Sequence, residues 1–121
     1  RPISILLSQN KIFGNSTVTV AHSRTSNLEE LCLESDLIIS AIGKPEFIKG
    51  NMIKKGSTII DVGITRVDDS SSHKGYRIAG DVDFNSVSSS VGFITPVPGG
   101  VGPMTIAMLL KNTLKACSLS D

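Results

Sequence analysis

The chain has 121 residues, of which 40% are hydrophobic and 19% charged, with four Phe, one Tyr and no Trp. At about 150 residues per domain, this length fits one domain with its own core. The net charge of +1 gives no strong field to recruit nucleic acid or an anionic membrane. Cys32 and Cys117 are too few for a disulfide framework and lack metal-site spacing, so we predict no metal. We expect both thiols to fill the core in a reducing compartment.

The termini and the apolar runs narrow the class of protein further. No run approaches the roughly 20 apolar residues that span a bilayer, and no signal-peptide pattern opens the chain. A membrane protein, a secreted disulfide-rich protein and a disordered tail are therefore disfavoured. Because the chain opens on Arg1 and Pro2 instead of Met, we expect it to be a segment of a longer protein.

Predicted helices and strands alternate from the start of the chain. Residues 2–7 predict a helix, because Pro suits the first helical position and the apolar side chains share one face. The β-branched residues at 17–22 predict a strand. Ser26 and Glu29, three residues apart, form a capping-box signature that predicts the start of a second helix.

Two continuous apolar runs, at 37–41 and 58–63, predict strands buried on both faces, as parallel sheets require. The remaining elements are a helical turn at 51–55, a polar loop at 68–75, weak strands at 77–82 and 92–95, and a long helix at 103–117. Strands that alternate with helices predict an α/β fold, with a parallel sheet covered by helices. Ligands of such sheets bind beyond the carboxyl ends of the strands.

The segment after the first predicted strand carries His22, Ser23, Arg24 and Thr25, and no acidic residue comes before Glu29. An acidic residue here would accept the ribose 2′-hydroxyl of NAD and repel a 2′-phosphate. The hydroxyl and guanidinium groups present can instead donate to a phosphate, which favours NADP over NAD. The alternative is that Ser23 and Thr25 only cap the following helix.

Small residues follow the next two strands. Ala41 and Gly43 end the first apolar run and Gly63 ends the second, so a flat ligand can approach the backbone closely. Ordinary tight turns are the alternative reading. Residues 95–105, TPVPGGVGPMT, hold three Pro and three Gly and lead into a helix whose N-terminus offers free N–H groups. A mere turn rarely needs so many such residues, which indicates a binding segment.

No catalytic group emerges from the residue types and their spacing. His22 and His73 are the only histidines, and neither fits a Ser–His–Asp or Cys–His arrangement. Asp61, Asp81 and Asp83 follow predicted strands, where we expect them to cap neighbouring loops or helices.

The segment TPVPGGVGPMT closely resembles the signature of the methylenetetrahydrofolate dehydrogenase/methenyltetrahydrofolate cyclohydrolase family, and the resemblance continues through TIAMLLKNTLKA. Further matching segments lie upstream in the same order: STVT at 16–19, HSRT at 22–25, SAIGKP at 40–45, IDVGI at 60–64 and GDVDF at 80–84. The resemblance implies a Rossmann-type NAD(P)-binding domain at the C-terminal end of a homodimeric bifunctional enzyme. Such enzymes oxidise 5,10-methylenetetrahydrofolate with NADP and hydrolyse 5,10-methenyltetrahydrofolate to 10-formyltetrahydrofolate.

The resemblance also implies roles for single residues. Ser23 matches the position that meets the 2′-phosphate, and Ile64 matches a backbone contact to the cofactor. Ala41 and Gly43 match the strand end beneath the cofactor, and Thr105 lies where the nicotinamide end is approached. The implied substrate-binding residues, which border the folate side of the cleft, are Pro98, Gly99, Gly100 and Val101.

Departures from the family pattern limit these expectations. The family's phosphate loop and first Rossmann strand should precede Arg1, and its catalytic lysine and tyrosine belong to an N-terminal domain. We therefore expect residues 1–121 to be an incomplete NAD(P)-binding domain that is inactive alone, from a cytoplasmic or mitochondrial enzyme. The alternatives are a non-catalytic nucleotide-binding or dimerisation module and the nucleotide domain of another dehydrogenase.

Overall fold

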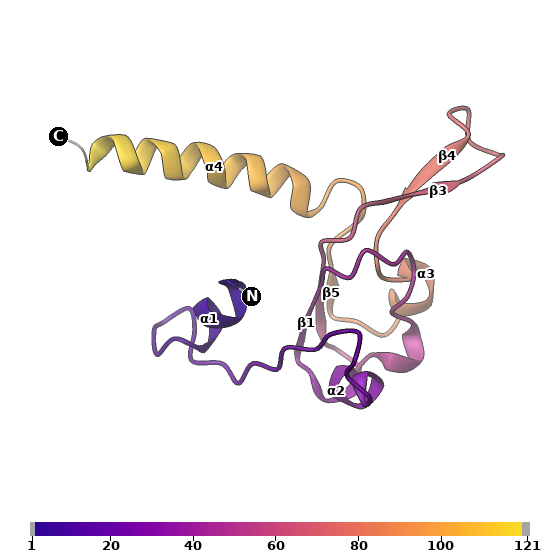
Figure 1. The fold of residues 1–121 in the computed structure, drawn as a ribbon, viewed down its shortest axis with the longest axis horizontal. Coiled ribbons are helices and arrows are strands. Elements are labelled where there is room, and N and C mark those ends of the chain that lie inside the picture. Colours follow the sequence, from indigo (N-terminus) through magenta and orange to yellow (C-terminus); the bar gives the residue numbers. More distant parts are fainter. Residues whose placement is uncertain (1, 120–121) are drawn as a thin grey trace.

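The computed structural model describes residues 2–119, and Figure 1 shows their arrangement. The elements in chain order are α1 (Pro2–Ser8), α2 (Leu28–Glu34), β1 (Leu37–Ser40), the 3-10 turn η1 (Gly50–Met52), β2 (Thr58–Asp61), β3 (Thr65–Asp68), β4 (Tyr76–Ala79), α3 (Phe84–Val87), β5 (Phe93–Ile94) and α4 (Val101–Ser118). The predicted helix at the start of the chain, both apolar strands and the long final helix are confirmed.

A parallel sheet with strand order β1-β2-β5 forms the centre of the fold. The register pairs Ile38 with Ile59 and Ile39 with Ile60, so the two strands run in phase. Burial alternates along them: Ile38 and Ile59 are buried, whereas Ile39 and Ile60 on the opposite face are half-buried. The predicted α/β fold with a parallel sheet is confirmed.

One hydrophobic core covers the buried face of the sheet. It joins side chains from α2, β1, the segment around η1, β2 and α3, namely Cys32, Ile38, Ile48, Ile53, Ile59, Val82 and Val87. Ile59 and Val87 are fully buried. Full burial of such a side chain contributes roughly 1.5–3 kcal/mol, so this cluster holds the strand ends in place.

The strand predicted at 17–22 does not form. This segment has no ladder partner among the described residues, and its Val20 is 56% exposed. β-branched residues favour an extended backbone, but a strand also needs a neighbour that accepts its hydrogen bonds. The capping box predicted before α2 is wrong as well. Asn27, not Ser26, is the N-cap, and no side chain caps this helix.

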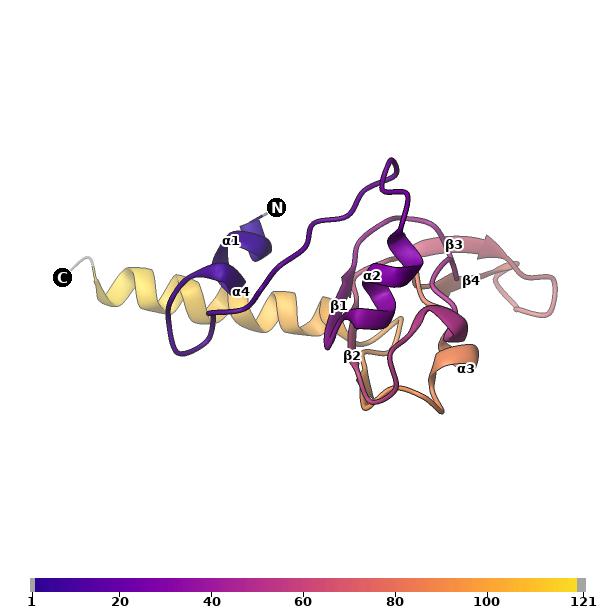
Figure 2. The same cartoon turned by 90° about the horizontal axis from the view of Figure 1, so that it is seen from below.

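The weak strand predicted at 77–82 exists as β4 but does not join the parallel sheet. It pairs antiparallel with β3, which the sequence analysis did not identify, and Tyr76 opposes Asp68. Figures 1 and 2 show that this hairpin extends away from the sheet. From β4 the Arg77 guanidinium donates to Glu46 at 2.8 Å.

The helix α4 extends away from the sheet on another side of the molecule (Figures 1 and 2). Its predicted apolar stripe is real, but Leu110 and Leu114 are 62% and 73% exposed. Cys117 on the same helix is exposed, so the expectation that both thiols are buried is correct only for Cys32. Within residues 2–119, no helix combines the length and apolar content needed to cross a bilayer.

Candidate dinucleotide site

The carboxyl ends of β1, β2 and β5 lie side by side at one edge of the sheet. Ser40 pairs with Asp61, and the N–H of Val62 continues the ladder by donating to the Ser40 carbonyl at 2.8 Å. On the other side of β2, the Thr95 N–H donates to the Ile59 carbonyl at 3.1 Å. Three segments that are far apart in sequence therefore meet at this edge.

A cavity of about 270 Å³ opens between two of these strand ends and the start of α4. Its lining comes from the β2 end and from residues 95–105, the Pro–Gly segment. The lining residues are Asp61, Val62, Gly63, Ile64, Pro96, Val97, Pro98, Gly99, Gly100, Val101, Gly102 and Thr105. Seven of the thirteen predicted contact residues are in this set: three of the nine cofactor contacts, namely Gly63, Ile64 and Thr105, and all four substrate contacts. Most of the lining is apolar or glycine, which suits the flat face of a ligand ring.

At two positions, Gly99 and Gly100, the backbone of the Pro–Gly segment takes a path that few residues other than glycine can adopt. Val97 and Pro98 are joined by a cis peptide bond, and Gly99 has φ 102°. A Cβ on Gly100 would lie 2.5 Å from the Pro96 carbonyl oxygen, which is closer than any real contact. The unusual composition is therefore required by the backbone that forms one wall of the cavity.

The N-terminus of α4 is directed into this region. Gly100 is the N-cap and supplies no side-chain cap, so the first N–H groups of the helix have no intrahelical acceptor. The Thr105 hydroxyl donates to the Val101 carbonyl at 3.0 Å, which leaves its oxygen as an acceptor beside the cavity. Such a helix start favours the polar or anionic edge of a ligand.

The buried carboxylate of Asp61 fixes the end of β2 through hydrogen bonds to backbone N–H groups. Its carboxyl oxygens accept the N–H groups of Gly63 at 2.9 Å and of Asp81 and Val82 at 3.0 Å each. Its own N–H donates to the Thr95 hydroxyl at 2.8 Å. Among the described residues that line the cavity, Asp61 alone has an ionisable side chain, and its oxygens are occupied by these donors. The described residues that line the cavity therefore offer no free acidic or basic side chain.

Asp81 fixes the end of β1 in the same way, by accepting hydrogen bonds from backbone N–H groups. It is fully buried, and its carboxyl oxygens accept the Ile42 N–H at 2.6 Å, the Lys44 N–H at 3.0 Å and the Ser40 hydroxyl at 3.2 Å. Asp83, the third acid of the set, caps α3 by accepting the Ser86 N–H. The prediction that these acids cap loops and helices is confirmed.

The remaining predicted cofactor residues lie outside the cavity. Ala41 and Gly43 occupy the neighbouring β1 end, where Gly43 has φ 75° and open space at the position of a Cβ. Residues 22–25 form a separate exposed turn before α2. There the Thr25 hydroxyl accepts the His22 N–H at 3.0 Å, and the Arg24 N–H donates to the His22 ring nitrogen Nδ1 at 3.2 Å. The structure thus places Ser23 in an exposed turn and not in the lining of the cavity.

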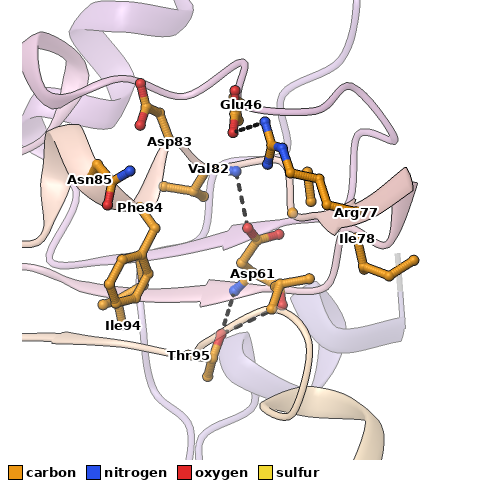
Figure 3. A pocket seen from close by; sticks show the side chains of 13 residues that line it. Glu46, Asp61, Arg77, Ile78, Val82, Asp83, Phe84, Asn85, Ile94 and Thr95 are labelled. Carbon is orange, nitrogen blue, oxygen red and sulfur yellow. Dashed lines mark hydrogen bonds and ion pairs between the residues drawn. The ribbon is translucent and has the colours of Figure 1, made fainter. Parts of the chain in front are cut away.

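A second, smaller cavity of about 120 Å³ was missed by the sequence analysis (Figure 3). Asp61 and Val97 line both cavities, so the two are neighbours. Among the side chains that line the second cavity, Figure 3 shows the Arg77–Glu46 ion pair and the hydrogen-bonded pair of Asp61 and Thr95. No local pattern predicts this cavity, because it depends on where the β3–β4 hairpin joins the sheet.

Comparison with known proteins gives the family. The sequence matches the model of the tetrahydrofolate dehydrogenase/cyclohydrolase NAD(P)-binding domain over residues 1–121. It is 64% identical over 116 residues to the bifunctional protein FolD of Flavobacterium johnsoniae, covering 96% of this chain and 39% of that protein. It is 59% identical over 121 residues to the bifunctional protein FolD of Protochlamydia amoebophila, covering all of this chain and 41% of that protein.

Solved structures agree with the sequence comparison. A 5,10-methylenetetrahydrofolate dehydrogenase from the silkworm Bombyx mori superposes with a TM-score of 0.84 at 45% identity, over 98% of this chain and 40% of that one. The Trypanosoma brucei methylenetetrahydrofolate dehydrogenase-cyclohydrolase, solved with NADP and an inhibitor, gives 0.79 at 48% identity, over 87% and 36%. The chain thus spans about two-fifths of the length of the relatives it matches. This chain belongs to the NAD(P)-binding domain family of tetrahydrofolate dehydrogenase/cyclohydrolase.

Proposed function

We propose that the chain provides the dinucleotide half of a bifunctional active site, which oxidises 5,10-methylenetetrahydrofolate with NADP and hydrolyses the 5,10-methenyl product to 10-formyltetrahydrofolate. The observation that carries this proposal is the cavity of about 270 Å³ at the β2 end. Residues from the β2 end and from the Pro–Gly segment face each other across it, which is where a nicotinamide ring and a folate must meet. Bound NADP supplies the hydride acceptor of the oxidation.

In the proposed reaction, this chain holds the cofactor and the folate and orients them toward each other. Gly63 and Ile64 line the cavity from the β2 end, and residues 98–101 line it from the Pro–Gly segment. In this proposal the first pair contacts the cofactor and the second set contacts the folate. Hydride transfer needs two carbon atoms held in contact, so rigid walls contribute through alignment. Because the cavity holds no free acid or base among the described residues, the hydrolysis requires a polarising group from outside this chain.

The exposed turn at 22–25 supports NADP as the dinucleotide. Within residues 2–119, the Ser23 hydroxyl and the Arg24 guanidinium make no hydrogen bond or ion pair, so both groups are available to a phosphate. The nearest acidic side chain in the sequence, Glu29, accepts the side-chain N–H of Asn51 at 2.9 Å. This donor set fits a 2′-phosphate better than a ribose 2′-hydroxyl.

A chimera tests the proposed function. The matching segment of the Flavobacterium johnsoniae protein, which is 64% identical over 116 residues, is replaced by the aligned part of this chain. We expect the chimera to oxidise 5,10-methylenetetrahydrofolate with NADP at a rate within about tenfold of the unmodified relative, since the cavity lining is intact. A folded chimera that binds no dinucleotide and lacks both activities would contradict the proposal.

Substitution of Ser23 in the same chimera tests the choice of dinucleotide. In Ser23→Asp, we expect the Kd for NADP to rise at least about tenfold, because a carboxylate repels the 2′-phosphate. The Kd for NAD should change much less. Ser26→Asp is the matched control, since it adds the same charge three residues away. Equal changes in both affinities would show that Ser23 does not face the 2′-phosphate.

A non-catalytic nucleotide-binding or dimerisation module stays the alternative. Titration of the isolated chain with NADP and NAD separates the two readings, because a self-sufficient module binds tightly without other segments. Homodimeric assembly and a cytoplasmic or mitochondrial location stay predictions that follow from the family resemblance.

A further inference from the structure

The buried carboxylates of Asp61 and Asp81 connect three segments that are distant in sequence. Asp61 fixes the Gly63 N–H at the β2 end and the backbone N–H groups of Asp81 and Val82. Asp81 in turn fixes the loop after β1 through Ile42 and Lys44. The strand end with Gly63 and the loop with Gly43 are therefore held by one continuous set of charge-assisted hydrogen bonds.

The loop after β1 is held in place mainly by contacts with residues 77–81. The Glu46 N–H donates to the Gly80 carbonyl at 2.9 Å, and the Glu46 carboxylate accepts from Arg77 at 2.8 Å. With the two N–H groups bound by Asp81, four contacts reach this loop from the segment 77–81. Glu46 has φ 55°, a conformation that costs energy for a residue with a side chain and persists only where the surrounding contacts impose it.

We propose that Asp81 is a positioning residue for the dinucleotide site, an inference that rests on the function proposed above. Its carboxylate is fully buried, and Asp81 is not among the residues that line the cavity. It acts by directing the Ile42 and Lys44 N–H groups inward, so that the loop presents carbonyl groups and Gly43 to the ligand. The loop is thereby shaped before the ligand arrives, which removes an ordering cost from binding.

Asp81→Asn tests this role in the chimera described above. The amide keeps one acceptor, but its NH₂ group must face either the Ile42 or the Lys44 N–H, so one contact becomes donor against donor. We expect the Kd and KM for NADP to rise about tenfold or more, with the folate KM unchanged and kcat at saturating NADP within about threefold. Asp83→Asn is the matched control, because Asn caps a helix as well as Asp does and the Asp83 carboxylate binds the Ser86 N–H and Lys49, not the Ile42 or Lys44 N–H group.

A purely structural role predicts a different result. Asp81→Asn would then lower the unfolding temperature but leave the NADP affinity of the folded protein within about twofold of the unsubstituted chimera, which would overturn the proposal. If the unsubstituted chimera binds no dinucleotide, the proposed function itself fails, and this result is visible before any variant is made.

Amide hydrogen exchange on the full chain gives a second measurement that does not depend on the folding of the variant. We expect the Ile42 and Lys44 N–H groups to exchange at least about 100-fold more slowly than in an unstructured peptide, without ligand. Exchange of both groups at the unprotected rate would show that Asp81 does not hold the loop in advance, and would overturn the inference.

Discussion

Substitution of Gly63 by Ala is the most direct test of how the site is built. A Cβ at this position would lie 2.5 Å from both Cγ and Oδ1 of Asp81, and 2.6 Å from its backbone nitrogen. Carbon contacts have their optimum near 3.5–4.0 Å, so the two groups must separate by about 1 Å. Asp81 cannot move freely, because it is bound to the loop after β1 and to Asp61.

The expected loss of stability follows from these contacts. Overpacking costs about 1–3 kcal/mol, and the loss of one hydrogen bond to a charged group adds about 1.5–3 kcal/mol. We therefore expect Gly63→Ala to lower the free energy of unfolding by about 3–5 kcal/mol. Domains of this size are stabilised by about 6–18 kcal/mol, so the effect is large and readily measured.

Urea denaturation followed by circular dichroism provides the measurement, and Gly102→Ala is the matched control. A Cβ at Gly102 meets nothing within 4 Å and lies in the first turn of α4, so we expect no loss and a gain of up to about 1 kcal/mol. A loss below about 1 kcal/mol in Gly63→Ala, with an unchanged denaturant slope, would refute the reasoning, because the Asp81 contacts would then be able to relax.

Three further predictions concern the core, the thiols and the hairpin tip. Ile59→Ala should lower the free energy of unfolding by about 2–5 kcal/mol, because Ile59 is fully buried; a loss under about 1 kcal/mol in denaturant titration would place it outside the core. Exposed Cys117 should react with a thiol reagent before Cys32, whose pKa is raised by burial; equal labelling rates by mass spectrometry would contradict this. A hydrogen bond from the Ser71 hydroxyl lowers the pKa of Asp69, so the stabilisation is present above the unfolded pKa and is lost as pH falls through the lower folded value. Ser71→Ala should raise this pKa in a carboxyl NMR titration, and an unchanged midpoint would assign the shift to another cause.

Local patterns were sufficient wherever one segment carries its own structural signal. The apolar runs that became β1 and β2 are recognisable because a strand in a parallel sheet is largely apolar along its length. The Pro–Gly segment was identified for the same reason, since its composition dictates a backbone that few other sequences adopt. The capping role of Asp61, Asp81 and Asp83 was also predicted, because short acidic side chains after strands bind nearby N–H groups.

Predictions failed where the structure depends on a partner elsewhere in the chain. Residues 17–22 have the composition of a strand but no neighbour to pair with among residues 2–119. β4 was recognised as a strand and assigned to the wrong sheet, because its partner β3 mixes polar and apolar residues and gives little signal alone. The stripe on α4 fits a packed helix, yet no described residue covers it.

The sequence by itself determined the α/β class, the position of the ligand-binding edge and the family, because apolar periodicity and Pro–Gly chemistry are properties of single segments. Only the tertiary structure decided which acceptor each N–H group has. It placed Gly63 so close to Asp81, 18 residues later in the chain, that a Cβ on Gly63 would lie 2.5 Å from the Asp81 carboxylate, and it bound that same carboxylate to the loop after β1. Hydrogen bonds and close packing of this kind depend on distances in space, which spacing along the chain does not reveal.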